Sequence, residues 1–260
     1  MTYQNHYLTD VIFRIDFVSP IESIQKDLDA DVRNVSAKYF PIPEPRTIEK
    51  KEVLVTDQPD KKDVVIKTQK IIEWHFWGKD REKELVIASN CVFVDFKAYH
   101  SFTDFKNEFF EIFEALQKAY PDIRPNRMGL RYIDQIDLLS DKSTRKNWGS
   151  YWTKYINSDL LRGLFFADDD KAITRYMNSI EMNYGTCMLR FQYGIHNQDY
   201  PAPNKKQIFI LDTDIYSSGL FTNEDANNAI DDYHTRAKDW FERSIKTALR
   251  EKMKVVDSNG

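Results

Sequence analysis

Apolar residues at every second position recur along this chain and predict most of its strands. In the segment 10–17, four large apolar residues stand at alternate positions, which is the period of a strand that buries one face. The same period predicts strands in 51–56, 64–68, 70–77, 85–96, 129–139, 173–195 and 207–216, with a turn at 183–185. Polar turns separate these stretches, which is typical of an antiparallel meander.

Two segments have the three- and four-residue spacing of long amphipathic helices. In 101–120, Ser101 is suited to be the N-cap, and Asp104 stands at capping-box spacing. In 223–254, Thr222 takes the same place before the apolar stripe. Shorter helical patterns cover 19–40 and 148–166.

These elements predict an α+β protein in which an antiparallel meander sheet packs against the two long helices. The polar, basic stretch 140–147 is the best candidate boundary, so we expect an N-terminal half, 1–140, and a C-terminal half, 141–260. Each half has a strand or hairpin followed by a helix. The two halves can therefore be similar and share one continuous sheet within one domain, although sheet-plus-helix order also arises without duplication.

Composition excludes several classes of protein. The 260 residues include 37 Lys+Arg and 41 Asp+Glu, and this near balance is unlike the basic excess of duplex-DNA binders. The two cysteines, Cys91 and Cys187, are too few for a disulfide framework or a zinc site and are expected to be free and buried. We find no signal-peptide pattern and no long apolar run, so we expect a cytoplasmic protein with no membrane partner.

Motifs of known chemistry are missing from the sequence. The eight glycines are dispersed, which excludes a phosphate-binding loop, and neither a nucleophile elbow nor a kinase signature is present. The five histidines are scattered and form no metal-binding pair. The sequence therefore leans against an enzyme and implies no cofactor and no metal.

Acidic residues give the one catalytic possibility. Asp212 and Asp214 stand two apart on a predicted strand, so both carboxylates point to one face. If Asp134 or Asp137 joined them, three carboxylates could hold Mg²⁺. The alternative is structural: Arg190 would face Asp212 or Asp214 across a hairpin and form a salt bridge.

Aromatic and basic residues give two candidate binding surfaces. Trp74, Phe76 and Trp77 crowd one strand, so an exposed tryptophan there would mark a partner-binding patch, although a strand buried on both faces also fits. A second surface combines cations with aromatic rings that could stack on bases. Its residues are Lys142, Arg145, Lys146, Lys154, Trp148, Tyr151 and Trp152.

Three segments carry a resemblance to a known family. They are 127–136 (RMGLRYIDQI), 10–17 (DVIFRIDF) and 240–249 (WFERSIKTAL). The chain resembles a sporadically distributed, uncharacterised bacterial family of about 250 residues with a Gly-Leu-Arg-Tyr-Ile segment. Asn usually follows that segment, and Asp134 stands there in this chain.

The patchy distribution of the family implies mobile genetic islands such as phage-defence or toxin–antitoxin loci. The family supplies no catalytic residue to carry over. Arg131 and Tyr132 match its most recognisable positions, and a structural role is favoured for both. Arg131 would pair with Asp137 or Glu73, and Tyr132 would pack in the core.

The leading functional hypothesis is a non-enzymatic cytoplasmic interaction or regulatory subunit, with a protein partner, of a phage-defence or toxin–antitoxin module. The alternative is a protein that binds RNA or single-stranded nucleic acid, or processes it with Mg²⁺. Its candidate catalytic residues are Asp134, Asp212, Asp214 and Arg131. A small-ligand pocket between the sheet and the last helix is a third possibility, and the oligomeric state stays open.

Overall fold

The computed structural model describes residues 2–58, 61–138, 148–169, 172–202 and 208–256. Its helix content is 35% and its strand content is 37%, which confirms the predicted α+β class. Side chains are described for these residues except 2, 50–67, 148 and 255–256.

The strands are β1 (Thr2–Tyr3), β2 (Leu8–Phe17), β3 (Ile42–Pro43), β4 (Arg46–Gln58), β5 (Lys61–Trp77), β6 (Lys83–Ala88), β7 (Cys91–Phe96), β8 (Pro125–Asp137), β9 (Tyr176–Asn183), β10 (Met188–Ile195), β11 (Ile208–Ser218) and β12 (Val255–Val256). The α-helices are α1 (Ala30–Tyr39), α2 (Phe102–Ala119), α3 (Trp148–Trp152), α4 (Arg162–Phe166), α5 (Asn223–Ser244) and α6 (Thr247–Met253). Two short 3-10 helices are η1 (Glu22–Gln25) and η3 (Ser158–Leu161).

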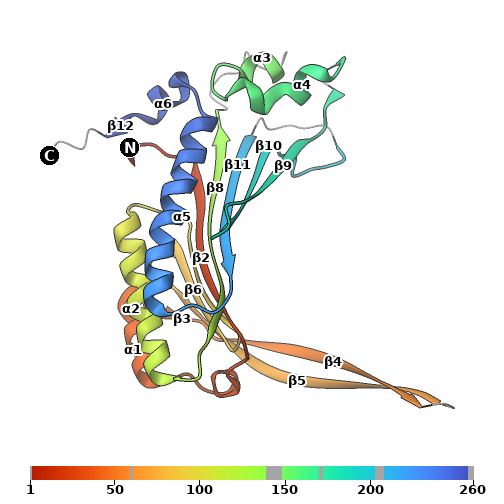
Figure 1. The fold of residues 1–260 in the computed structure, drawn as a ribbon, viewed down its shortest axis with the longest axis vertical. Coiled ribbons are helices and arrows are strands. Elements are labelled where there is room, and N and C mark those ends of the chain that lie inside the picture. The colour runs from red at the N-terminus through yellow and green to blue at the C-terminus, as the bar shows by residue number, and fades with distance from the viewer. Residues whose placement is uncertain (1, 59–60, 139–147, 170–171, 203–207, 257–260) are drawn as a thin grey trace. The chain divides into compact units, whose positions relative to one another are not determined.

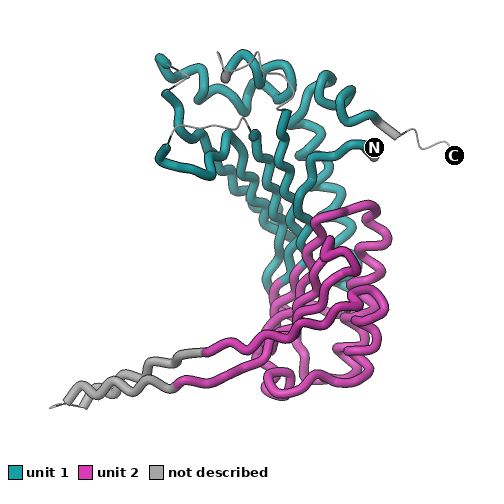
Figure 2. The backbone as a smooth tube through the Cα atoms, turned by 180° about the vertical axis from the view of Figure 1, so that it is seen from behind, with its two compact units in different colours: residues 1–13, 128–218, 224–260 teal, residues 14–127, 219–223 magenta. Residues whose placement is uncertain are grey.

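Ten strands form one antiparallel sheet in the order β3-β5-β6-β7-β2-β8-β11-β10-β9, with β4 paired to β5 (Figure 1). The chain forms two compact units (Figure 2). Unit 1 contains residues 1–13, 128–218 and 224–260, and unit 2 contains residues 14–127 and 219–223. These units are a different partition from the predicted halves 1–140 and 141–260.

The core of unit 2 lies between its strands and the pair α1 and α2. The apolar stripe of α2 is buried, and edge-on ring contacts such as Phe96–Phe105 fill the space beneath it. Ser101 Oγ accepts a hydrogen bond from the backbone N–H of Asp104 over 3.3 Å, so the predicted N-cap is confirmed. In the segment 19–40, Asp29 instead caps α1, and η1 stands apart from it. The single helix predicted there was therefore wrong.

Two strand predictions in unit 2 were also wrong. Residues 85–96 form the hairpin of β6 and β7 with Ser89 and Asn90 at its turn, because all four residues 85–88 are buried and hide the alternation. The stretches 64–68 and 70–77 belong to one strand, β5. Most of β5 pairs with β4, from Arg46 opposite Glu73 to Gln58 opposite Lys61, and Figure 1 shows the two as a long ribbon.

In unit 1, α5 packs on one face of the strands β8, β11, β10 and β9. Tyr233 hydrogen bonds to Ser217 of β11, and Trp240 packs on Phe191 of β10. The predicted turn at 183–185 joins β9 and β10. The helix predicted over 223–254 ends at Ser244, because Ile245 forms an isolated β-bridge with Ile156, and α6 follows.

The stretch 148–166 forms α3, η3 and α4 where one mixed helical pattern was predicted. Cys91 and Cys187 are free and buried, as predicted. Among the described residues, no helix is long and apolar enough to cross a membrane.

Candidate functional site

Two arginine–aspartate pairs line the face of the unit 1 sheet opposite α5. Arg131 of β8 donates two hydrogen bonds to Asp212 of β11, over 2.8 and 2.6 Å. Arg190 of β10 lies directly opposite Asp214 of β11 and donates to it over 3.0 Å, which confirms the predicted cross-strand salt bridge. Both carboxylates of the strand are therefore occupied by guanidinium groups.

The partner of Arg131 differs from the prediction, which named Asp137 or Glu73. The order of strands brings β8 beside β11, so Asp212 is the near carboxylate. The hydrogen bonding of Arg131 to Asp212, in which Arg131 donates, is the main reason that the pKa of Arg131 is raised. Asp212 is itself buried beneath this pair.

Asp134 lies on the other face of the same sheet, so it cannot join Asp212 and Asp214 in a carboxylate cluster. Along β8 the buried positions are Leu130, Tyr132, Asp134 and Ile136, whereas Arg131 points to the opposite side. Among the described residues, no group of three His, Cys, Asp or Glu side chains is arranged to hold a metal ion. The arrangement gives no support to Mg²⁺-dependent cleavage.

The environment of Asp134 is apolar apart from a nearby polar pair. Burial alone raises the pKa of its carboxyl from 3.8 to about 7, and no described residue forms a hydrogen bond or ion pair with that carboxyl. On the same face, the hydroxyl of Tyr132 lies 2.7 Å from Nδ1 of His234 on α5. Burial lowers the pKa of His234 to about 4, so this imidazole is neutral at pH 7.

The strand that carries Trp74 and Trp77 has one ring on each face. Trp74 donates from Nε1 to the carbonyl of Ile24 over 2.8 Å, and it is half-buried against η1. Trp77 is half-buried on the other face. The guanidinium groups of Arg46 and Arg81 lie 6.0 and 5.4 Å from its ring.

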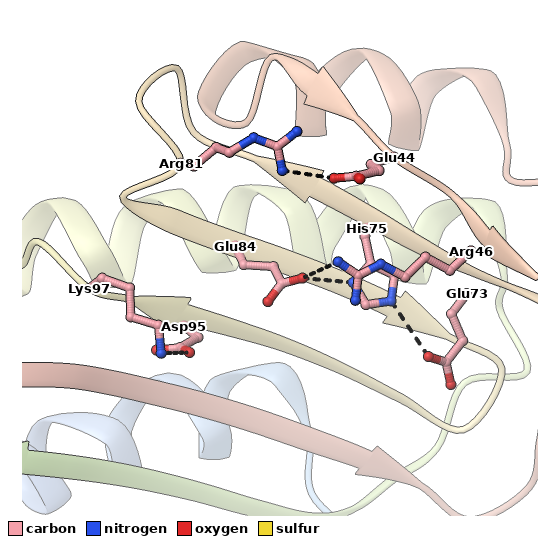
Figure 3. A network of polar contacts seen from close by, with 8 residues as sticks. All are labelled: Glu44, Arg46, Glu73, His75, Arg81, Glu84, Asp95 and Lys97. Carbon is pink, nitrogen blue, oxygen red and sulfur yellow. Dashed lines mark hydrogen bonds and ion pairs between the residues drawn. The ribbon is translucent and has the colours of Figure 1, made fainter. Parts of the chain in front are cut away.

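A network of ion pairs surrounds His75 of β5 and reaches the neighbouring strands of unit 2 (Figure 3). His75 Nδ1 lies 2.7 Å from Oε1 of Glu84, which is also 3.9 Å from Arg46. Arg81 donates to Glu44 over 2.9 Å, which lowers the pKa of that carboxyl. Lys97 lies 2.6 Å from Asp95 in a further pair. Each cation drawn in Figure 3 thus has a carboxylate neighbour.

The second predicted surface is only partly visible. Lys142, Arg145 and Lys146 lie outside the described residues, and so does the side chain of Trp148. Trp152 is fully buried, and its ring packs on Phe209 at 5.2 Å between centroids. Trp152 therefore belongs to the core, because β11 covers the ring that was predicted to meet a partner.

Sequence reasoning identified Trp77 but missed the residues around it. Strand pairing brings Arg46 and Glu84 to Trp77 and His75, and the connection between β5 and β6 carries Arg81. The positions of these residues in the sequence show no pattern. One signal was available: Arg81 follows the turn Gly78-Lys-Asp80, which returns the chain toward the strand just completed.

Comparisons with known proteins identify no relative. No family model matches the chain, and no curated protein matches it either.

Proposed function

We propose that this protein is a non-catalytic interaction subunit that binds a protein partner through the surface around Trp77. We call this the Trp77 surface. It consists of Glu44, Arg46, Trp77, Arg81 and Glu84, which lie over the buried His75. The observation that carries the proposal is the half-buried Trp77 ring with two guanidinium groups within 6.0 Å of its centroid. Tryptophan and arginine are the residue types that contribute most binding energy at protein interfaces.

The charges on the Trp77 surface favour a protein partner over a nucleic acid. A phosphate backbone is bound by cations that are available to replace its counterions. Here Arg81 is paired with Glu44, and Glu84 lies between His75 and Arg46. A surface with both signs of charge and a central aromatic ring complements a mixed protein surface instead.

The biological setting is proposed from the family resemblance alone. We propose that the partner belongs to a phage-defence or toxin–antitoxin module of the source cell. The identity of a stoichiometric partner, obtained by mass spectrometry, checks this part of the proposal separately from the surface that binds it.

The test is affinity purification of the tagged chain from its native host, with and without nuclease treatment. We expect a stoichiometric protein that survives nuclease and whose recovery falls at least about tenfold in Arg81→Ala, since such a loss equals about 1.4 kcal/mol. Arg243→Ala is the matched control, because Arg243 lies 5.5 Å from the ring of Trp240 in unit 1. Co-purified RNA or DNA that nuclease removes would contradict the proposal and support the nucleic-acid alternative.

A further inference from the structure

The strand β9 forms an open edge of the sheet in unit 1. In the described part of the chain it pairs with β10 alone and is the last strand in the order. Figure 1 shows it beyond β10. Along its outer side, about half of its backbone N–H and C=O groups point away from β10. Such a row is a template for another strand.

This edge has only one of the features that usually prevent strand addition, the charge of Glu181. Natural edge strands carry lysine, proline or a bulge. β9, with the sequence YMNSIEMN, has no lysine or proline, and its eight residues pair with β10 without interruption. Two of its apolar side chains are exposed, Met177 by 39% and Ile180 by 36%. They lie on opposite faces of the strand, so a strand added at this edge would cover part of each.

Two residues of opposite charge at this edge indicate which partner strand would pair with β9. Arg175 immediately precedes β9, and Glu181 lies near its end; both are exposed. Neither forms an ion pair with a described residue. Arg175 lies over the ring of Tyr200 at 4.3 Å, and Glu181 stands opposite Arg190 of β10, whose guanidinium pairs with Asp214. A partner strand that matches this edge therefore needs an acid and a base at the corresponding separation. The same segment of a second copy, running antiparallel, supplies both.

We propose that β9 pairs with β9 of a second copy of this chain around a twofold axis that passes through Asn178. The axis must lie on a residue, because opposite residues have to share a face of the joined sheet. In this register Arg175 of each copy lies opposite Glu181 of the other, and Tyr176 lies opposite Ile180. Opposite charges and aromatic–β-branched pairs both stabilise antiparallel strands.

The neighbouring registers lack this complementarity. Centring the axis on Ser179 places Glu181 opposite Met177, and centring it on Ile180 places Glu181 opposite Ser179. Neither joins opposite charges. The inference is independent of the proposed function, since β9 belongs to unit 1 and the Trp77 surface to unit 2.

Charge reversal and its rescue test the pairing in the full-length protein by sedimentation velocity. The wild type is expected to sediment with twice the chain mass of 30.8 kDa. Glu181→Arg places two arginines opposite each other at two symmetric positions. We expect the dissociation constant to rise roughly 10- to 30-fold. The double variant R175E/E181R exchanges the charges and is expected to return to within about threefold of wild type.

Two further variants control this experiment. Glu251→Arg makes the same change of net charge at an exposed position on α6, and dimerisation should be unchanged. Asn178→Cys should form a disulfide across the axis on mild oxidation, because directly opposite Cβ atoms are close enough for one. The native Cys91 and Cys187 are buried and should not compete.

Several outcomes would overturn the proposal. One is a wild type that stays monomeric up to about 100 μM, since such a pairing would be weaker than most specific contacts. Another is a dimer that Glu181→Arg leaves intact or that R175E/E181R does not restore. Disulfide formation through Ile180→Cys in place of Asn178→Cys would exclude the Arg175–Glu181 pairing. Capture of another protein's strand by monomeric chain would assign the edge to a different partner.

Discussion

Burial without a partner gives Asp134 an unusual ionisation. Its carboxyl lies on the α5 side of β8, between Tyr132 and Ile136, and its pKa is raised to about 7. The unfolded chain binds its proton with a pKa near 3.8. Well below pH 3.8 the carboxyl is protonated in both states. As pH rises from 4 to 7 only the unfolded state ionises, so the folded state loses stability relative to it.

Replacing Asp134 by Asn should remove this dependence, because the amide is neutral and has nearly the same shape. We expect the unfolding free energy of Asp134→Asn, relative to wild type, to grow by up to about 1.4 kcal/mol per pH unit between pH 4 and 7. Above pH 7 the difference should level off. Urea denaturation of both proteins at several pH values measures it.

Asp137→Asn is the matched control, since it neutralises an exposed carboxyl on the same strand. Its difference from wild type should change much less with pH. If the Asp134→Asn difference were constant from pH 4 to 8, the carboxyl would have to be ionised in the folded state and stabilised by a partner.

At the scale of elements, local patterns were sufficient where one face of a segment is polar. The alternation in β2 and β8 and the stripe of α2 predicted those elements close to their bounds. The prediction for β6 was wrong because this strand is buried on both faces, so no polar position marked the turn that follows it. In β5 the polar residues in its outer part suggested that the strand is interrupted. Its pairing with β4 continues without interruption through this part.

The β4–β5 ribbon beyond Lys51 and Thr68 should not contribute to the core of unit 2. Its strand pairing there is between β4 and β5 alone. We predict that replacing residues 52–67 by Asn-Gly, which joins the paired residues Lys51 and Thr68 by a two-residue turn, changes the thermal midpoint by less than about 3 °C. Circular dichroism measures the midpoint.

Ile87→Ala provides the comparison, because Ile87 is fully buried in β6 and its truncation should cost about 2–5 kcal/mol. A drop after ribbon shortening as large as that of Ile87→Ala would show that the ribbon stabilises the unit.

For the whole molecule, the sequence predicted the α+β class but did not show which strands distant in the sequence lie next to each other. The hairpin pair Arg190–Asp214 was predictable because one connection separates its strands. The pair Arg131–Asp212 joins strands 81 residues apart, and the surroundings of Trp77 also depend on pairing. Local periodicity reports which face of a strand is buried, but the neighbour of each strand is decided by the packing of the entire sheet.

The interleaving of the two units leads to a prediction about fragments. Fragment 141–260 lacks β8 and β2 and therefore the buried residues Phe13, Leu130 and Ile136. By contrast, fragment 14–127 keeps nearly all of unit 2 in one continuous stretch. We expect fragment 14–127 to unfold cooperatively on heating. Fragment 141–260 should show no cooperative transition, because the apolar side chains that β8 and β2 cover in the full chain would face water. Cooperative unfolding of 141–260 would instead support two autonomous halves divided near residue 140.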